Sequence, residues 1–336
     1  MKVDVSEIKT YKSCRRQWLL TSRNRFHLRP VVTPSHFALG TIFHESLHAM
    51  YMGAPLEKVM QFVRQEISTD NEAALLSMVP GYYRNVLPGD LDRFKVLDIE
   101  HHFSFVPADP DTGEILDPDV EVCGSIDMIV LDEAENAIYG FEHKTCKNFR
   151  DTAFGWMDEQ PRVYTYALQQ YVREYNAKQE DEWVRECDRV RNDWERLHSA
   201  PVDDLISFSP IPPDSIYPAK PEPATLGGIY INEVKKLLRD FKYQRTLYTY
   251  PGDDLRNFMR AFFGTCCACH KSVLTNDPAY PSPSYMGCSM CDYKTICETY
   301  MYSTLDKDTV IEEFKEEFKV REEDHLEEKT ERMMNK

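Results

Sequence analysis

The stretch GSIDMIVLDEAENAIYGFEHKT, residues 124–145, decides the expected fold. Two apolar runs rich in β-branched and aromatic residues are separated by the short polar turn DEAEN, which predicts a β-hairpin. Asp127 lies within the first run, and Glu142 and Lys144 follow the second. Because side chains alternate along a strand, Glu142 and Lys144 share one face, and Asp127 reaches that face if the two strands pair. The hairpin therefore predicts two carboxylates and a lysine around one point.

These side chains suit the hydrolysis of a phosphate ester. Carboxylate oxygens hold hard divalent cations such as Mg²⁺ or Mn²⁺, and the cation lowers the pKa of a bound water and polarises the phosphodiester. A lysine in the same pocket orients the water or stabilises the developing charge. An ordinary hairpin with solvated charges would also fit an isolated D-x14-E-x-K spacing. Here no other charge interrupts the apolar run IDMIV around Asp127, which favours a site.

Around the hairpin, helical and strand patterns alternate in blocks. Apolar residues at helical spacing predict helices over residues 4–20, 37–52 and 55–87, the last ending at the turn signal Pro88-Gly89. Runs of β-branched and aromatic residues predict strands over residues 96–106, 120–132 and 137–145. Residues 1–92 are therefore expected to be helical, with a sheet following them.

The second half returns to helical patterning at about Asp158. Residues 201–223 contain seven prolines and are expected to form an extended surface connection. A further helix is expected around Ile231–Phe241, before a cysteine-rich segment at 266–297. The charged end of the chain, residues 301–336, is expected to be a solvated helix or a frayed tail.

The arrangement GSIDMIV…YGFEHKT resembles the RecB-like nuclease branch of the PD-(D/E)XK superfamily. Upstream, GTIFHESLHAMY resembles the first motif of that branch, whose histidine is a metal ligand and would here be His44. Downstream, EQPRVYTYA resembles its Q-x-x-x-Y motif and gives Gln160 and Tyr164, which lie on one face of a helix. Glu100, in DIEHHF, matches an acid often found before the catalytic hairpin. The resemblance covers about residues 5–170.

This resemblance implies an α/β fold with a restriction-endonuclease-like core, a mixed central sheet flanked by helices. It implies metal ligation by His44, Asp127, Glu142 and, less directly, Glu100, assistance to the attacking water by Lys144, and substrate positioning by Gln160 and Tyr164. The implied activity is DNA hydrolysis with Mg²⁺ or Mn²⁺, as an exonuclease on single-stranded ends in recombination, repair or replication. The sequence has no G-x4-G-K-[ST] helicase motif, so a helicase or recombination partner would have to unwind a duplex.

The cysteines add a second candidate site. GCSMCDYKTICETY places Cys288, Cys291 and Cys297 in the spacing C-x2-C-x5-C, and three thiolates need a fourth to complete a metal or cluster site. YKSCRRQW offers Cys14. RecB-like nucleases that carry an iron–sulfur cluster have this layout of one N-terminal and three C-terminal cysteines. The resemblance therefore implies a structural [4Fe–4S] cluster that joins the two ends of the chain.

A zinc ribbon is the alternative use of the cysteines. Cys266 and Cys269 form C-x2-C, followed after 18 residues by a second C-x2-C at 288–291. The ribbon would leave Cys14 and Cys297 without a role, so the cluster is favoured. The cluster in turn leaves the roles of Cys266, Cys267, Cys269 and His270 open.

A zinc protease is the alternative use of the first motif. His44-Glu45-Ser46-Leu47-His48 matches H-E-x-x-H, and a third ligand could come from the acids of Glu66-Ile-Ser-Thr-Asp70. This interpretation leaves the hairpin, the Q-x-x-x-Y motif and the cysteines unexplained. A third function class is a catalytically silent DNA-binding subunit with a zinc ribbon, against which the intact acids and lysine argue.

The net charge of −16 is unusual for a DNA-binding protein, because phosphate contacts need lysine and arginine. Residues 1–30, however, carry eight basic side chains against two acidic ones, whereas residues 301–336 carry twelve acidic against seven basic. Side chains that could line a phosphate channel or stack on single-stranded bases are Arg15, Arg16, Arg23, Arg25, Arg29, Trp18, Tyr164 and Tyr166. The alternative is a solvated basic surface with core aromatics.

The sequence predicts a cytoplasmic protein. No apolar run reaches the roughly 18 residues of a membrane span, and MKVDVSEIKTYKSC lacks a secretory stretch, so the ten cysteines indicate a reducing compartment. A bacteriophage, bacterial or archaeal source would fit. We expect one nuclease domain over residues 1–300, divided into a helical N-terminal part (1–92), a catalytic core (93–176), a helical and proline-rich insertion (177–262) and a cysteine-rich cluster segment (263–300), followed by an acidic helix or tail (301–336).

Overall fold

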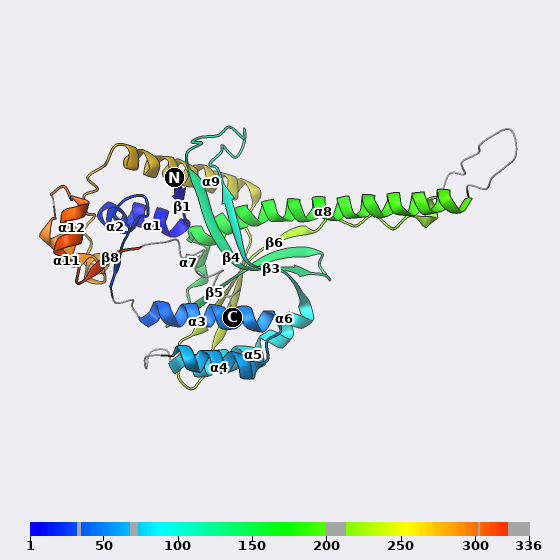
Figure 1. Cartoon of the computed structure of the whole chain (residues 1–336), viewed down its shortest axis with the longest axis horizontal. Helices are drawn as coiled ribbons and strands as arrows, with labels where there is room; N and C mark the ends of the chain where they lie inside the picture. The colour runs from blue at the N-terminus through cyan, green and yellow to red at the C-terminus, as the bar shows by residue number, and fades with distance from the viewer. Residues whose placement is uncertain (32–34, 68–72, 199–212, 302, 322–336) are drawn as a thin grey trace.

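A mixed sheet lies between two groups of helices (Figure 1). The structure, a computed structural model, describes residues 1–31, 35–67, 73–198, 213–301 and 303–321. The elements in chain order are β1 (Lys2–Val3), α1 (Val5–Ser13), α2 (Arg15–Thr21), β2 (Leu28–Pro30), α3 (Ser35–Tyr51), α4 (Leu56–Glu66), α5 (Leu75–Asn85), α6 (Leu87–Arg93), β3 (Phe94–Phe105), β4 (Glu121–Asp132), β5 (Ala137–Cys146), α7 (Thr152–Met157), α8 (Glu159–His198), the 3₁₀ turn η2 (Asp214–Ile216), β6 (Thr225–Lys235), β7 (Tyr243–Tyr248), α9 (Gly252–Leu274), α10 (Tyr285–Ser289), α11 (Lys294–Thr299), α12 (Lys307–Glu313) and β8 (Phe318–Val320). The expected mixed α/β fold is confirmed.

The sheet has six strands and is centred on β4 and β5. One edge of β4 pairs with β3 along its length. Its other edge pairs with β1 at 121–122 and with β5 at 128–132. β6 then adds to β5 in parallel, and β7 to β6 in antiparallel orientation. The three strands predicted from the sequence are therefore confirmed as β3, β4 and β5.

Each face of the sheet has its own hydrophobic core. On one face α1, α2, α8 and α9 pack through side chains such as Ile8, Trp18 and Phe263. On the other face α3, α4 and α5 pack through Phe43, Tyr82 and their neighbours. Burial of this apolar area is the main force that holds the helices on the sheet.

Two predicted helices are interrupted. The helix expected over 4–20 is split at Cys14, whose extended backbone (φ −153°, ψ 110°) ends α1 and begins α2. The helix expected over 55–87 is divided into α4 and α5, and Pro88-Gly89 lies inside α6 instead of ending a helix. Proline is tolerated there because a backbone N–H in the first turn of a helix has no acceptor within the helix, so its loss breaks no helical hydrogen bond.

The helix expected around Ile231–Phe241 is wrong, because residues 225–235 form strand β6. Ile231 faces one core and Val234 the other, so the strand is buried on both faces. An apolar run of this kind lacks the alternation that separates a strand from a buried helix. Gly228 is required here, since a Cβ on it would lie 2.6 Å from the carbonyl oxygen of Tyr248.

Helix α8 extends well beyond the sheet (Figure 1). The proline-rich connection returns along it where it is described: Trp183 donates to the carbonyl of Pro218, and Asn176 pairs with the backbone of Ala224. At the end of the described chain, the expected tail contains α12 and β8, and β8 pairs with β2. Within the described residues, no helix is long and apolar enough to cross a membrane.

Candidate active site

Asp127 and Glu142 lie where β4 and β5 separate. The ladder between the two strands ends with Met128 opposite Phe141, so the next position in that register sets Asp127 against Glu142. Beyond this point β5 stays paired with β6. Facing side chains of an antiparallel pair lie on the same side of a sheet. The predicted hairpin therefore forms, and it directs the two carboxylates to one place.

Asp127 is held by contacts from two elements. Its Oδ2 accepts a hydrogen bond of 2.7 Å from the backbone N–H of His143 on β5. Its Oδ1 lies 3.4 Å from Nδ1 of His44 on α3. Burial alone would raise the pKa of the Asp127 carboxyl, but His44, His143 and Lys144 together outweigh burial and hold this pKa below its usual value. Asp127 is consequently a carboxylate at neutral pH.

Glu142 is more deeply buried, with 3% of its surface exposed. Its Oε1 accepts hydrogen bonds from Lys144 and from Gln160, the latter at 2.9 Å. Its Oε2 is buried without a hydrogen-bond partner. Burial, followed by the like charge of Asp127, raises the pKa of Glu142. Burial would lower the pKa of Lys144, but the two carboxylates outweigh it and raise that pKa.

Gln160 and Tyr164 lie on one face of α8, as their spacing predicts. Gln160 Nε2 donates to the Tyr164 hydroxyl at 2.9 Å as well as to Glu142. Tyr164 is only 8% exposed, and burial raises the pKa of its hydroxyl well above the usual value. Stacking of Tyr164 on a base is therefore wrong, because the ring belongs to the core. Through Gln160, the motif holds the Glu142 carboxylate in place.

A small pocket of about 20 Å³ opens beside Asp127. His44, His48 and Glu100 line it together with Asp127 and other residues. Glu100 has a positive φ of 53°, a conformation that L residues rarely adopt. Such strain is found most often at functional sites. Glu100, whose match to the family motif was the least specific, thus lies at the same pocket as His44 and Asp127.

The comparison with known families decides the class of protein. The family model of the PD-(D/E)XK nuclease superfamily matches residues 3–298. The chain belongs to the PD-(D/E)XK nuclease superfamily. Comparison with curated proteins gives no match. Membership identifies a metal-dependent nuclease, a hydrolase that would act on DNA and for which Mg²⁺ or Mn²⁺ is the usual ion, and it favours this activity over the zinc-protease alternative.

The acids and the lysine of the PD-(D/E)XK motif are close together, but they are not arranged as a closed metal site. Among the residues that the structure describes, no group of three or more His, Cys, Asp or Glu side chains is placed to hold an ion. The acids instead contact nitrogen donors, His44 beside Asp127 and Lys144 on Glu142. The donor types nevertheless fit a hard cation, and the buried Glu142 Oε2 has a lone pair that no protein group uses.

Sequence reasoning did not identify a buried polar network that lies behind the hairpin. Arg245 on β7 makes two hydrogen bonds to Asp90, of 2.6 and 2.7 Å, and a third of 2.6 Å to the Asn232 oxygen. The Asn232 amide nitrogen therefore faces Nδ1 of His143, 3.2 Å away. Burial lowers the pKa of His143 to about 3, so its ring is neutral. His143 points away from Glu142 as predicted, but its backbone holds Asp127, and only the folded chain brings these partners together.

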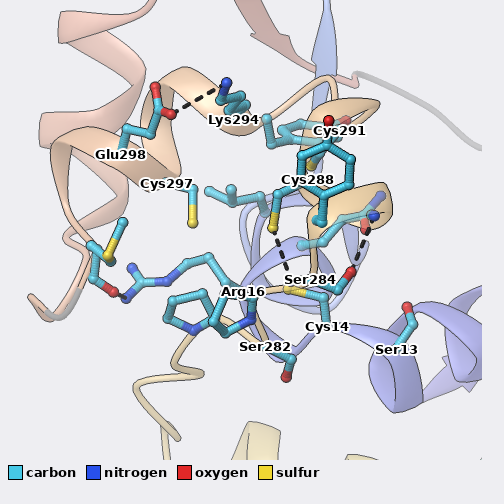
Figure 2. A pocket seen from close by; sticks show the side chains of 18 residues that line it. Ser13, Cys14, Arg16, Ser282, Ser284, Cys288, Cys291, Lys294, Cys297 and Glu298 are labelled. Atoms are coloured by element: carbon cyan, nitrogen blue, oxygen red, sulfur yellow. Dashed lines mark hydrogen bonds and ion pairs between the residues drawn. The ribbon is translucent and has the colours of Figure 1, made fainter.

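The four cysteines at the two ends of the chain surround one pocket. Cys14, Cys288, Cys291 and Cys297 all line a cavity of about 410 Å³, which we call the four-thiol pocket (Figure 2). All four side chains are half-buried, and the backbone N–H of Ser284 contacts the Cys288 sulfur at 3.4 Å. Burial raises the pKa of the Cys297 thiol, which Arg16 opposes.

The zinc ribbon, the alternative use of Cys266 and Cys269, finds no support in the fold. Both side chains are fully buried in the core along the middle of α9. Burial raises the pKa of Cys269 to about 12, so its thiol stays protonated. Cys288 and Cys291 instead share the four-thiol pocket with Cys14 and Cys297. The nearby His270 pairs with Asp117 at 2.8 Å.

The predicted DNA-contacting side chains near Cys14 are mostly engaged within the protein. Trp18 is fully buried and donates to Glu7, so it cannot stack on a base. Arg16 is 1% exposed, so its expected phosphate contact is also wrong. Arg25 donates to the carbonyl oxygens of Ser272 and Asp277. The remaining candidates include Arg15, Arg23, Arg29 and Tyr166, and Arg15 lies over the Tyr11 ring at 3.4 Å. The alternative of core aromatics therefore holds for Trp18.

Proposed function

We propose that this nuclease hydrolyses DNA from single-stranded ends, with Asp127, Glu142 and His44 as metal ligands and with a structural [4Fe–4S] cluster in the four-thiol pocket. The observation that carries the catalytic part is the pair of carboxylates at the point where β4 and β5 separate, with Lys144 on one of them. The cleavage of DNA during recombination, repair or replication is the corresponding role.

Each side chain has a distinct task in this proposal. Asp127 and Glu142 Oε2 offer oxygen ligands, and His44 offers a nitrogen beside Asp127. A buried carboxylate oxygen without a partner is costly, and a cation would satisfy it. When bound, Mg²⁺ or Mn²⁺ supplies an activated water and polarises the phosphodiester. Glu100, at the same small pocket, is a further candidate ligand, acting directly or through a water.

Lys144 and Gln160 prepare the site for reaction. Both donate to Glu142 Oε1, so Oε2 is the oxygen that would be left to hold a cation. The Lys144 ammonium, held at the same carboxylate, would orient the attacking water or stabilise charge on the phosphate. Tyr164 completes the arrangement by accepting from Gln160, which fixes the amide.

The depth of the site supports the proposed preference for single strands. Glu142 is almost fully buried, and the Lys144 side chain is 28% exposed. A flexible strand end can reach recessed groups that a rigid duplex of larger diameter reaches less easily. This agrees with the RecB-like motifs of the sequence. In the cell, a helicase or recombination partner would then supply the single-stranded end.

The cluster assignment rests on the shape of the four-thiol pocket. In a [4Fe–4S] cluster each cysteine binds a different iron, so the four sulfurs surround a volume and need not meet at one point. Four thiols around a cavity of about 410 Å³ suit that requirement. Because the cysteines come from both ends of the chain, metal binding is expected to be coupled to folding.

A cleavage assay tests the catalytic proposal. The substrates are end-labelled single strands, blunt duplexes and single-stranded circles, each with Mg²⁺, Mn²⁺ or EDTA. The expected result is metal-dependent shortening of linear single strands from their ends, with circles left intact. Lys144→Ala, purified identically, should lose at least about a hundredfold in rate, which excludes a contaminating nuclease. DNA binding without hydrolysis by any of these metals would instead support the silent binding subunit.

A further inference from the structure

One buried cation faces the four-thiol pocket. Arg16 lines the pocket and is 1% exposed. Its Nη2 donates to the carbonyl oxygens of Met301 and Ser303, at 3.3 and 3.0 Å. Its Nε and Nη1 are buried without hydrogen-bond partners. A buried guanidinium with two unused donors is costly unless an anion or acceptor completes it.

The thiols are the nearest candidates for that anion. Cys14 and Cys297 line the same pocket as Arg16 (Figure 2). Two other charged side chains line the pocket, Lys294 and Glu298, and they pair with each other at 3.4 Å. Their opposite charges largely cancel, and both are exposed. Arg16 is thus the buried, uncompensated charge at this pocket.

We propose that Arg16 is the counter-charge of a dianionic four-thiolate centre and that its free N–H groups donate to the sulfurs of that centre. The inference rests on the four-thiol ligand set proposed above, and it adds a residue to it. Four thiolates around a [4Fe–4S]²⁺ core, or around a single Zn²⁺, both carry a net charge of −2. Either centre would satisfy Arg16, whereas four neutral thiols would not.

The proposal predicts opposite effects on the empty and the loaded protein. Without metal, Arg16 is a buried charge with no anionic partner and two unused donors, so its removal should leave the apo chain at least as stable. With metal, the same removal leaves a buried dianion without its cation. If Arg16 served only to bind the Met301 and Ser303 carbonyls, its removal would instead destabilise the metal-free and the metal-bound protein equally.

The test compares three full-length variants after anaerobic purification and iron–sulfur reconstitution. Arg16→Met removes the charge, and Arg16→Lys keeps it. The matched control is Arg15→Met, because Arg15 is the adjacent residue but lies over Tyr11, outside the pocket. The measurements are bound iron and zinc per chain, the rate of metal release to a chelator, the reduction potential of any cluster, and urea unfolding of the apo protein.

Arg16→Met should release metal at least tenfold faster than the wild type and shift the reduction potential of a cluster to more negative values. Arg16→Lys should stay within about threefold of the wild-type release rate, and Arg15→Met should match the wild type. Equal release from the wild type and Arg16→Met would overturn the counter-charge, as would equal loss in the Met and Lys variants. If Arg16→Met is insoluble, Arg16→Lys decides, since metal loss in that variant also overturns the role.

The two proposals can fail separately. A wild-type chain that binds zinc and no iron would overturn the iron–sulfur cluster, and faster zinc release from Arg16→Met would still support the counter-charge. A chain that holds a cluster insensitive to Arg16 would overturn only the role of Arg16. A wild-type chain that binds neither metal would overturn both.

Discussion

The catalytic hairpin and the four-thiol pocket are assembled in opposite ways. Asp127 and Glu142 lie on neighbouring strands, β4 flanked by β3 and β5 by β6, and a backbone N–H fixes Asp127. Cys14 lies at a break between two helices, Cys288 and Cys297 lie in α10 and α11, which have five and six residues, and Cys291 lies in the link between these two helices. Helices this short are marginal by themselves. The first site is therefore organised by the sheet, and we expect the second to depend on what its thiols bind.

The two sites also differ in how deeply their surroundings are buried. The hairpin is covered by a core on each face of the sheet. Beside the four-thiol pocket, Tyr285 is 92% exposed and Met290 76% exposed. Tyr293 and Ile296 anchor this segment in the core, but the exposed side chains around them add little apolar burial to offset the entropy of ordering it. Substitutions should therefore separate a loss of chemistry at the hairpin from a loss of order at the pocket.

The largest effect is expected from Asp127→Asn. The amide keeps an oxygen for the His143 N–H but loses the negative charge that a cation needs. Cleavage should fall at least about a thousandfold, because a bound metal contributes several kcal/mol to the transition state. The melting temperature and the metal content of the four-thiol pocket should not change. Activity within tenfold of the wild type would contradict the assignment of Asp127.

Cys14→Ser should have the converse effect. With one ligand missing, the pocket should lose its cluster, and limited proteolysis should then cut within residues 281–301. Far-UV circular dichroism should change little, because the sheet does not depend on the pocket. Cys187→Ser is the control, since Cys187 is a buried thiol on α8 away from the pocket. Full iron content in Cys14→Ser would remove Cys14 from the ligand set.

The same contrast explains what could be predicted from the sequence. The hairpin was predictable because its strands are adjacent in the chain and its acids interrupt an apolar pattern. His44 and Gln160 were identified through the resemblance, since nothing local reveals that helices α3 and α8 would reach the hairpin. The buried pair of Asp90 and Arg245 has no local signal, because its members are 155 residues apart.

The errors also have physical causes. Strand β6 was mistaken for a helix because both of its faces are buried. Trp18 was a candidate for base stacking because aromatic and basic residues adjoin it, yet its ring fills the core. Burial is a property of the whole fold, so a motif can identify the type of a side chain but not whether it faces solvent.

Arg245→Met tests how far the hairpin depends on the network behind it. The substitution leaves Asp90, which is 5% exposed, as a buried carboxylate without its main partner. Unfolding in urea should show a loss of about 3 to 5 kcal/mol, typical of a broken buried ion pair. The double variant Asp90→Asn/Arg245→Met should recover part of this loss. If it is as unstable as Arg245→Met alone, the cost comes from lost packing and not from an unpaired charge.

The smallest effect concerns Glu7, on the helix that leads to Cys14. Its carboxylate accepts hydrogen bonds from Trp18 and Ser22, yet burial raises the pKa of Glu7 above its usual value. Because the folded chain then binds this proton more tightly than the unfolded chain, the stabilisation is full below the unfolded pKa and is lost as pH rises through the folded pKa. At pH 7 the charged Glu7 thus lowers stability.

Glu7→Gln should therefore stabilise the metal-free protein at pH 7, by about 1 kcal/mol or less. The gain should shrink as pH falls towards 4, where the wild-type carboxyl takes up its proton. Urea unfolding of both proteins between pH 4 and 8 measures this difference. A gain that does not vary with pH would show that the charge of Glu7 is not its cause. A gain that does vary would mean that the helix beside the four-thiol pocket carries a buried charge at the expense of its own stability, a cost that the sheet-built site shares at Glu142, whose pKa burial also raises.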